Sequence, residues 1–223
     1  LRKRNFMKVQ VITLFPEMFP GVMDTSMLWK AQDKKILDIS YINLRDFGIG
    51  PRKTVDDTPY GGGDGMLLKP EPLFAAVEAA KKNDPTALVV LMTARGDRWV
   101  QAKAQELATG QQGLIIICGR YEGYDERITS VVDLQVSIGD YVLTGGEIAA
   151  MIIVESVIRL IPGVLGGENS AEIESFSDGK TLVFPQYTRP EVFMDMKVPD
   201  VLLSGNHAEI EKWRQDNSEL AQG

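Results

Sequence analysis

TALVVLMTARGDRWVQAKAQELATGQQGLIIIC, residues 86–118, holds two short apolar runs on either side of a polar stretch. The runs 86–93 and 113–118 are almost wholly apolar, which is typical of strands buried on both faces of a parallel sheet. The stretch 97–108 between them predicts a helix. Strand, helix and strand in this order indicate a unit whose two strands lie parallel in one sheet.

The same alternation extends in both directions along the chain. Runs rich in β-branched residues predict further strands, and helical patterns separate them, one with proline in its first turn. We expect strands at 9–15, 36–44 and 134–139, helices at 24–34, 70–82 and 145–160, and a short helix at 124–132. The fold class is therefore α/β, with a mainly parallel sheet covered by helices on both faces.

The composition changes after residue 162, where glycine, serine and acidic residues accumulate. We expect a sheet domain at 1–162, a linker at 163–180 and a small helical C-terminal domain at 181–223. The part 163–178 has no evident anchors, so we expect it to be poorly ordered in the free protein. No apolar run reaches membrane-spanning length, and we expect no membrane partner.

The few cysteine and histidine residues exclude several kinds of site. Cys118 is the single cysteine and His207 the single histidine, so one chain cannot assemble a Cys/His zinc site. A catalytic triad would have to use His207, whose place at the start of a late helix favours a capping or surface role. One cysteine also suits a reducing cytoplasm. Catalysis is therefore expected from carboxylates, arginine and backbone groups.

The charge distribution bears on possible partners. The formal net charge is −7, which argues against nucleic-acid binding through bulk electrostatics. Residues 163–223 carry five basic and eleven acidic side chains, whereas residues 1–162 carry nineteen and twenty. A nucleic acid would therefore have to be held by a focused basic patch.

Three glycine-containing segments follow predicted strands, namely LMTARG (91–96), CGRYEGYDER (118–127) and SIGDYVLTGGE (137–147). Each one alone is more often a tight turn. Together at one sheet edge they favour a ligand pocket lined by backbone groups. No lysine is present to anchor a triphosphate, so a nucleotide held by its base and ribose is favoured.

Several charged residues have both a structural and a functional interpretation. Arg120 and Glu122 could form a surface ion pair or line a pocket. Arg159 ends an apolar helix, where it would suit the helix dipole or stabilise a developing oxyanion. The acidic residues of the linker are solvated by default. The long irregular stretch 45–69 is of the kind that is functional or disordered.

Seven motifs occur in an order that resembles the bacterial tRNA (guanine-37-N1)-methyltransferases of the SPOUT superfamily. The resemblance covers nearly the whole chain after Met7, and the residues before Met7 then form an extension. The motifs are LFPEMF (14–19), VDDTPYGGG-GM (55–66), CGRYEG-DER (118–127), SIGDYVLTGGE (137–147), IPGVLG (161–166), YTRPEV (187–192) and SGNHAEI-KWR (204–214).

The resemblance implies a fold, a cofactor and an assembly. The sheet domain would contain a deep trefoil knot, whose glycine loops hold S-adenosylmethionine in a bent shape. The chain would form a homodimer with active sites shared between subunits. The methyl acceptor would be N1 of guanosine 37 in tRNA, 3′ to the anticodon, which maintains the reading frame during translation.

The resemblance also assigns roles to individual residues. Glu174 corresponds to the base that removes the N1 proton, and Arg159 to the cation that steadies charge on O6. Glu122 and Asp56 affect activity, and magnesium assists the reaction, with Glu122 as the candidate for its influence. No spacing of possible ligands requires a metal ion bound by the protein.

The resemblance implies two further sets of residues. The cofactor-binding residues would be Met92, Thr93, Gly119, Tyr121, Gly123, Ser137, Ile138, Gly139, Tyr141, Leu143, Gly145 and Gly146. The tRNA contacts that we expect are Lys53, Arg189, Lys212 and Arg214.

The chain departs from the family pattern at four places. Glu174 stands where aspartate is more frequent, Arg52 where histidine is frequent, and Asp64 where proline is frequent, while LMTARG replaces a segment that usually reads SPQG. Two alternatives stay open: a SPOUT enzyme that modifies a different RNA, and a nucleotide-binding module without catalysis.

Overall fold

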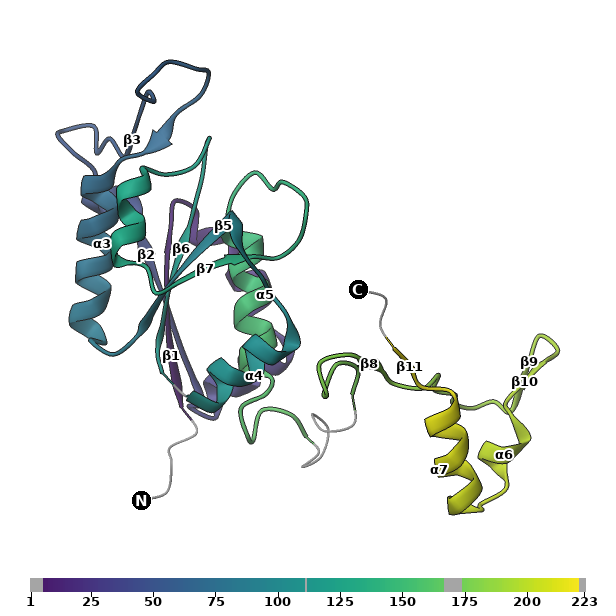
Figure 1. The fold of residues 1–223 in the computed structure, drawn as a ribbon. Helices are drawn as coiled ribbons and strands as arrows, with labels where there is room; N and C mark the ends of the chain where they lie inside the picture. Colours follow the sequence, from purple (N-terminus) through teal and green to yellow (C-terminus); the bar gives the residue numbers. More distant parts are fainter. Residues whose placement is uncertain (1–5, 111, 167–173, 221–223) are drawn as a thin grey trace. The chain divides into compact units, whose positions relative to one another are not determined.

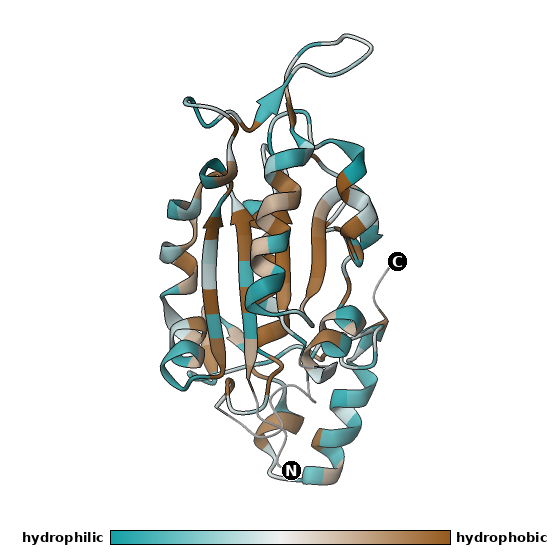
Figure 2. Cartoon of the chain, turned by 90° about the vertical axis from the view of Figure 1, so that its left-hand side faces the viewer, coloured by the Kyte–Doolittle hydropathy of each residue, from teal (hydrophilic) through white to brown (hydrophobic). Residues whose placement is uncertain are grey.

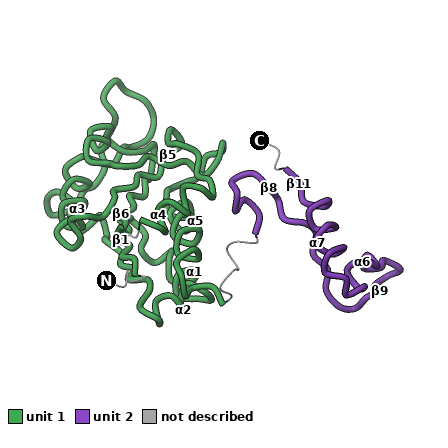
Figure 3. The backbone as a smooth tube through the Cα atoms, turned by 60° about the horizontal axis from the view of Figure 1, so that its bottom comes forward, with its two compact units in different colours: residues 1–168 green, residues 169–223 purple. Residues whose placement is uncertain are grey.

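The computed structural model describes residues 6–110, 112–166 and 174–220. The chain divides into two compact units, residues 1–168 and 169–223, which are coloured separately in Figure 3.

The first unit is built on a five-stranded sheet (Figure 1). Its strand order is β2-β1-β6-β5-β7, and every neighbouring pair is parallel. The predicted α/β class with a mainly parallel sheet is confirmed. The trefoil knot stays a prediction. The strands are β1 (Met7–Thr13), β2 (Leu37–Asn43), β5 (Leu88–Arg98), β6 (Leu114–Cys118) and β7 (Leu134–Ser137).

Helices and short turns connect these strands. The α-helices are α1 (Pro20–Met23), α2 (Ser26–Asp33), α3 (Pro70–Asn83), α4 (Gln101–Gly110) and α5 (Glu147–Ile158). The 3-10 helices are η1 (Pro16–Met18), η2 (Leu44–Phe47) and η3 (Glu126–Val131). A small ribbon pairs β3 (Asp56–Asp57) with β4 (Leu67–Leu68).

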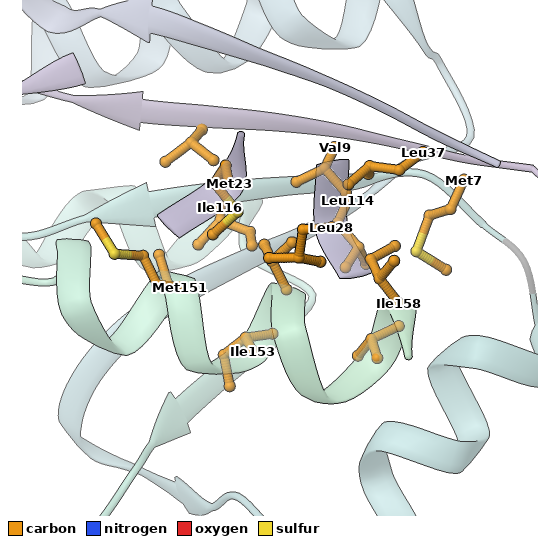
Figure 4. Close-up of a cluster of buried hydrophobic side chains, with 14 of the residues drawn as sticks. Met7, Val9, Met23, Leu28, Leu37, Leu114, Ile116, Met151, Ile153 and Ile158 are labelled. Carbon is orange, nitrogen blue, oxygen red and sulfur yellow. The ribbon is translucent and has the colours of Figure 1, made fainter. Parts of the chain in front are cut away.

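The hydrophobic core lies on both faces of the sheet, because β6 is buried along its whole length. Leu114 and Ile116 belong to one cluster, with residues of α2, α4 and α5, part of which Figure 4 shows. Ile115 and Ile117 belong to the other cluster, with residues of α3 and η3. Figure 2 shows the central strands as largely hydrophobic. The apolar run 113–118 therefore forms a strand buried on both faces, as predicted.

Helix α4 begins later than predicted. The helix expected at 97–108 starts at Gln101, because β5 continues through Arg98. A register shift follows Met92, after which Asp97 and Arg98 pair with the end of β7. This second stretch of pairing joins residues far apart in sequence, so the local helical pattern could not reveal it.

The segment after α5 is packed onto the first unit. Ile161 and Val164 are buried in its core, and Lys34 Nζ donates a hydrogen bond of 2.8 Å to the carbonyl of Gly163. The predicted linker start at residue 163 therefore falls inside a packed turn, and the unit extends to residue 168. Residues 167–173, which belong to the segment expected to be poorly ordered, lie outside the described residues.

The second unit combines two helices with two short ribbons. Helix α6 (Asp200–Leu203) precedes α7 (His207–Asp216), which begins at the predicted histidine and is capped by Asn206. The rings of Phe184 and Tyr187 each lie 6.3 Å from the ring of Trp213. The ribbons pair β8 (Thr181–Leu182) with β11 (Glu219–Leu220), and β9 (Val192–Phe193) with β10 (Met196–Lys197).

The turn around Asp178 is held by hydrogen bonds. Its carboxylate accepts hydrogen bonds from the backbone amides of Lys180, at 2.9 Å, and Thr181, at 2.7 Å, and from the Thr181 hydroxyl. Ser175 Oγ also accepts from the amide of Val183. The expectation that 163–178 lacks anchors was therefore wrong for its last residues, because an acidic side chain stabilises the turn locally.

No helix in the described part of the chain is long and apolar enough to cross a membrane.

Acid should open the Asp178 turn. Hydrogen bonds from Thr181 and Lys180 lower the pKa of the Asp178 carboxyl from 3.8 to about 2. A lowered folded-state pKa adds stability above pH 3.8, which is lost as the pH falls through about 2. Amide chemical shifts of residues 178–182 followed by NMR should report this transition. In Asp178→Asn the same amides should show no such acid step. A step of equal size in that variant would refute the assignment.

Candidate functional site

A pocket of about 720 Å³ lies at the carboxyl ends of β5, β6 and β7. This is the sheet edge at which open α/β sheets bind ligands. Residues 92–95, at the register shift within β5, line it together with the loops after β6 and β7, and all twelve residues expected to bind a cofactor are among the lining residues. The three glycine-containing segments therefore do meet in one place, although LMTARG lies inside β5 and not after it.

The loops after β6 and β7 approach each other at Gly146. The amide of Gly146 donates a hydrogen bond of 2.9 Å to the carbonyl of Gly119. A Cβ atom at Gly146 would lie 2.8 Å from Cα of Cys118 and 3.1 Å from Cβ of Met92. Only glycine allows this approach without a shift of the backbone.

Local hydrogen bonds hold the start of the loop after β7. Ser137 Oγ donates to the carbonyl of Gly139 and accepts from its amide, at 3.2 and 3.3 Å. Gly139 has a φ of 154°, and a side chain there would collide with the ring of Tyr141. Tyr141 as a residue is 56% exposed, and it lines the pocket.

An ion pair joins Arg120, a partly buried residue of the pocket lining, to Glu147. The carboxylate of Glu147 is fully buried, and its Oε2 lies 2.9 Å from Nε of Arg120. These two atoms are too poorly aligned for a hydrogen bond, so the contact is one of charge. The interpretation of Arg120 and Glu122 as a surface pair was wrong, because Arg120 turns inward to Glu147.

Sequence reasoning assigned no role to Glu147. A signal for it exists: an acidic residue directly after a Gly-Gly pair, at the first position of an apolar helix, suits the helix dipole. Burial, together with the charge of Glu147, raises the pKa of the neighbouring Cys118 thiol well above its ordinary range. Cys118 is therefore a packed thiol rather than a nucleophile.

The stretch 45–69 contributes a further wall. The amide of Glu122 donates to the carbonyl of Met66, and the amide of Leu68 donates to the carbonyl of Gly123, both at 3.0 Å. Pro59 and Tyr60 also line the pocket, as does Glu122. Asp56 lies one strand further out, paired with Leu68, and is not a lining residue.

Arg159 lies away from the pocket, although both belong to the first unit. Arg159 caps the C-terminal end of α5, whereas Glu147 begins that helix beside the pocket. Twelve residues separate the two ends, which corresponds to about 18 Å of helix. Glu174 belongs to the second unit, within the turn that contains Asp178.

The four expected tRNA contacts differ in their surroundings. Lys53, in the first unit, lies 3.1 Å from the carboxylate of Asp46. Arg214, in the second unit, stacks 5.1 Å above the ring of Phe184. Arg189 and Lys212 are exposed on the second unit.

The described ranges 6–110, 112–166 and 174–220 contain no group of three His, Cys, Asp or Glu residues arranged to hold a metal ion.

Replacing Gly146 by alanine should destabilise the first unit. The added methyl group would force the backbone of Cys118 away from the loop, at a cost of about 1–3 kcal/mol. Urea unfolding followed by circular dichroism measures this cost. Gly110→Ala is the matched control, because no atom lies within 4 Å of a Cβ at that helical position. Equal stability of the two variants would contradict the close approach.

Comparisons with known proteins agree with this architecture. The sequence profile of the family described as tRNA (Guanine-1)-methyltransferase TrmD matches residues 7–222. The tRNA (guanine-N(1)-)-methyltransferase of Geobacillus kaustophilus is 54% identical over 213 residues, which is 95% of this chain and 86% of the relative. The same enzyme of Staphylococcus haemolyticus is 54% identical over 211 residues, which is 94% of this chain and 85% of the relative.

A solved structure is also similar. The crystal structure of tRNA (m1G37) methyltransferase from Aquifex aeolicus superposes with a TM-score of 0.78 at 37% identity, covering 93% of this chain and 87% of that one. The profile match and the identities over nearly the whole chain lead to one conclusion: this chain belongs to the tRNA (guanine-N1)-methyltransferase family.

Proposed function

We propose that this protein transfers the methyl group of S-adenosylmethionine to N1 of guanosine 37 in tRNA. The family to which the chain belongs methylates guanine N1 in tRNA. The observation that carries the proposal is the pocket in which all three glycine-containing segments meet. A pocket of about 720 Å³ has the size expected for a site that takes a nucleoside-sized cofactor.

The lining of the pocket supports an adenosyl group rather than a polyphosphate. Its basic side chains are Arg95 and Arg120, with no lysine among the described lining residues. The side chain of Arg120 is already paired with Glu147, and Arg95 lies 3.8 Å from Glu126. Backbone groups of Ile138 and Gly139 would therefore hold the cofactor, as the resemblance implies.

The reaction needs a base and a cation. The sulfonium of the donor supplies an activated methyl group. The lactam N1 of guanine carries a proton, and a carboxylate must remove it while charge moves onto O6. Glu174 is the proposed base, and Arg159 is the proposed donor to O6. Asp56, on the ribbon behind the pocket wall, would support that wall.

Magnesium would assist the reaction, as the resemblance implies, with Glu122 as the candidate for its influence, and Glu122 does line the pocket. The described residues do not form a metal-binding cluster of their own.

A homodimer would complete the site. Arg159 lies at the far end of α5 from the pocket of its own chain. Ile148, Ile152 and Glu155 are exposed on that helix, at spacings that continue to Arg159 on the same face. Val142, beside the start of this stripe, is 91% exposed. Docking a second copy on this apolar stripe would cover it and carry Arg159 towards the other copy.

Contacts to tRNA would come from both units. Lys53 on the first unit and Arg189, Lys212 and Arg214 on the second are the proposed phosphate contacts. Because the second unit is acidic in sum, these few cations would have to act locally.

The base assignment has a direct test. Glu174→Gln should lower kcat for methyl transfer from labelled S-adenosylmethionine to unmodified tRNA by roughly 10²-fold or more. Glu174→Asp keeps the carboxylate and should retain most of the rate. The cofactor affinity of both variants should stay near that of the parent. Unchanged turnover by Glu174→Gln would remove Glu174 from the mechanism. Transfer to tRNA with guanosine 37 replaced would favour a different RNA position.

The shared site can be tested with mixed dimers. Glu122→Ala and Arg159→Ala protomers, each inactive as homodimers, are co-expressed with different tags and purified as heterodimers. If Arg159 acts on the other copy's pocket, one of the two sites is intact and about half the parental activity should return. If both residues act within one chain, every site carries a lesion and no activity returns.

A further inference from the structure

Arg120 connects the two loops that form the deep wall of the pocket. Its backbone belongs to the loop after β6, and it is bridged there to Gly145 of the loop after β7. Its side chain packs against Gly145 so closely that any Cβ at that position would collide with the guanidinium. Nη1 also lies 3.4 Å from the carbonyl of Thr144. One side chain therefore spans from one loop to the other.

Glu147 and the chain after β1 fix the orientation of this side chain. Glu147 Oε2 faces Arg120 Nε, while Glu147 Oε1 accepts a hydrogen bond of 2.8 Å from the hydroxyl of Thr13. Thr13 Oγ1 accepts in turn from the amide of Phe15, whose ring lies 4.4 Å below the guanidinium. The guanidinium of Arg120 is thus held by the carboxylate of Glu147, the carbonyl of Thr144 and the ring of Phe15.

We propose that the buried Arg120–Glu147 pair is a positioning device for the cofactor pocket. It keeps the loops 119–123 and 137–146 closed on each other in the arrangement that receives the adenosyl group. Neither residue touches the reacting atoms in this proposal. The inference depends on the proposed function, because it takes the ligand of the pocket to be S-adenosylmethionine.

If the Arg120–Glu147 pair positions the loops, its loss should affect cofactor binding separately from the stability of the fold. A buried ion pair stabilises little overall, but removing one partner leaves an uncompensated charge. Glu147→Gln and Arg120→Gln should therefore each lower the melting temperature. The double variant leaves no unpaired charge, so its melting temperature should be close to that of the parent. It still lacks the guanidinium that joins Arg120 to Thr144 and Phe15.

The experiment compares cofactor affinity with thermal stability. Titration calorimetry should show about a tenfold or greater loss of S-adenosylmethionine affinity in both single variants and in the double variant. At saturating cofactor, kcat should stay within about twofold of the parent. Arg127→Gln, which removes an exposed arginine paired with Asp125, is the matched control and should bind normally. A double variant that recovers both stability and affinity overturns the proposal.

A second ligand separates positioning from direct contact. 5′-Methylthioadenosine lacks the amino and carboxylate groups of the cofactor. If the pair positions the loops, Arg120→Gln should weaken both ligands by the same factor. A loss confined to S-adenosylmethionine would mean that Arg120 binds the carboxylate directly, which overturns the proposal. If the parental protein does not bind S-adenosylmethionine at all, it is the proposed function that fails.

Discussion

The close approach of two backbones at Gly146 is the constraint on which the rest of the site depends. Gly146 lies against Cys118 and Gly119, so the end of β6 and the start of α5 occupy adjacent places. This contact sets where the loop after β7 must return, and that return encloses the pocket. It also delivers Glu147 to a fully buried position beside Arg120. The shape of the pocket is thus set by the packing of the backbone.

Local sequence patterns predicted the parts of the fold that have local causes. The apolar run of β6 indicated a strand buried on both faces, and the proline-initiated α3 was predicted to within a residue of its end. The extension of β5 to Arg98 was missed, because its pairing with β7 is a long-range contact. The Asp178 turn was missed because acidic linker residues are solvated by default, whereas this one accepts backbone amides.

The candidate site also combines features that local sequence predicted with features that depend on long-range contacts. The glycine-containing loops were identified from their places after neighbouring strands, and the structure brings them together. The partner of Arg120 was not identifiable, since Glu122 is near it in sequence, whereas Glu147 is brought to it only by the fold. Helix α5 separates Arg159 from the pocket of its own chain, and a pattern of residues along the sequence does not reveal this separation.

Helix α5 has one more property that follows from its two ends. Its first residue is fixed beside the pocket by the Arg120 contact, and its last turn presents Arg159. Each residue inserted into an α-helix advances the chain by about 1.5 Å and rotates it by about 100°. A single insertion or deletion would therefore turn Arg159 off the exposed stripe, while leaving the pocket intact. The side on which Arg159 lies therefore depends on the length of this helix, whereas many apolar residues could fill its buried face.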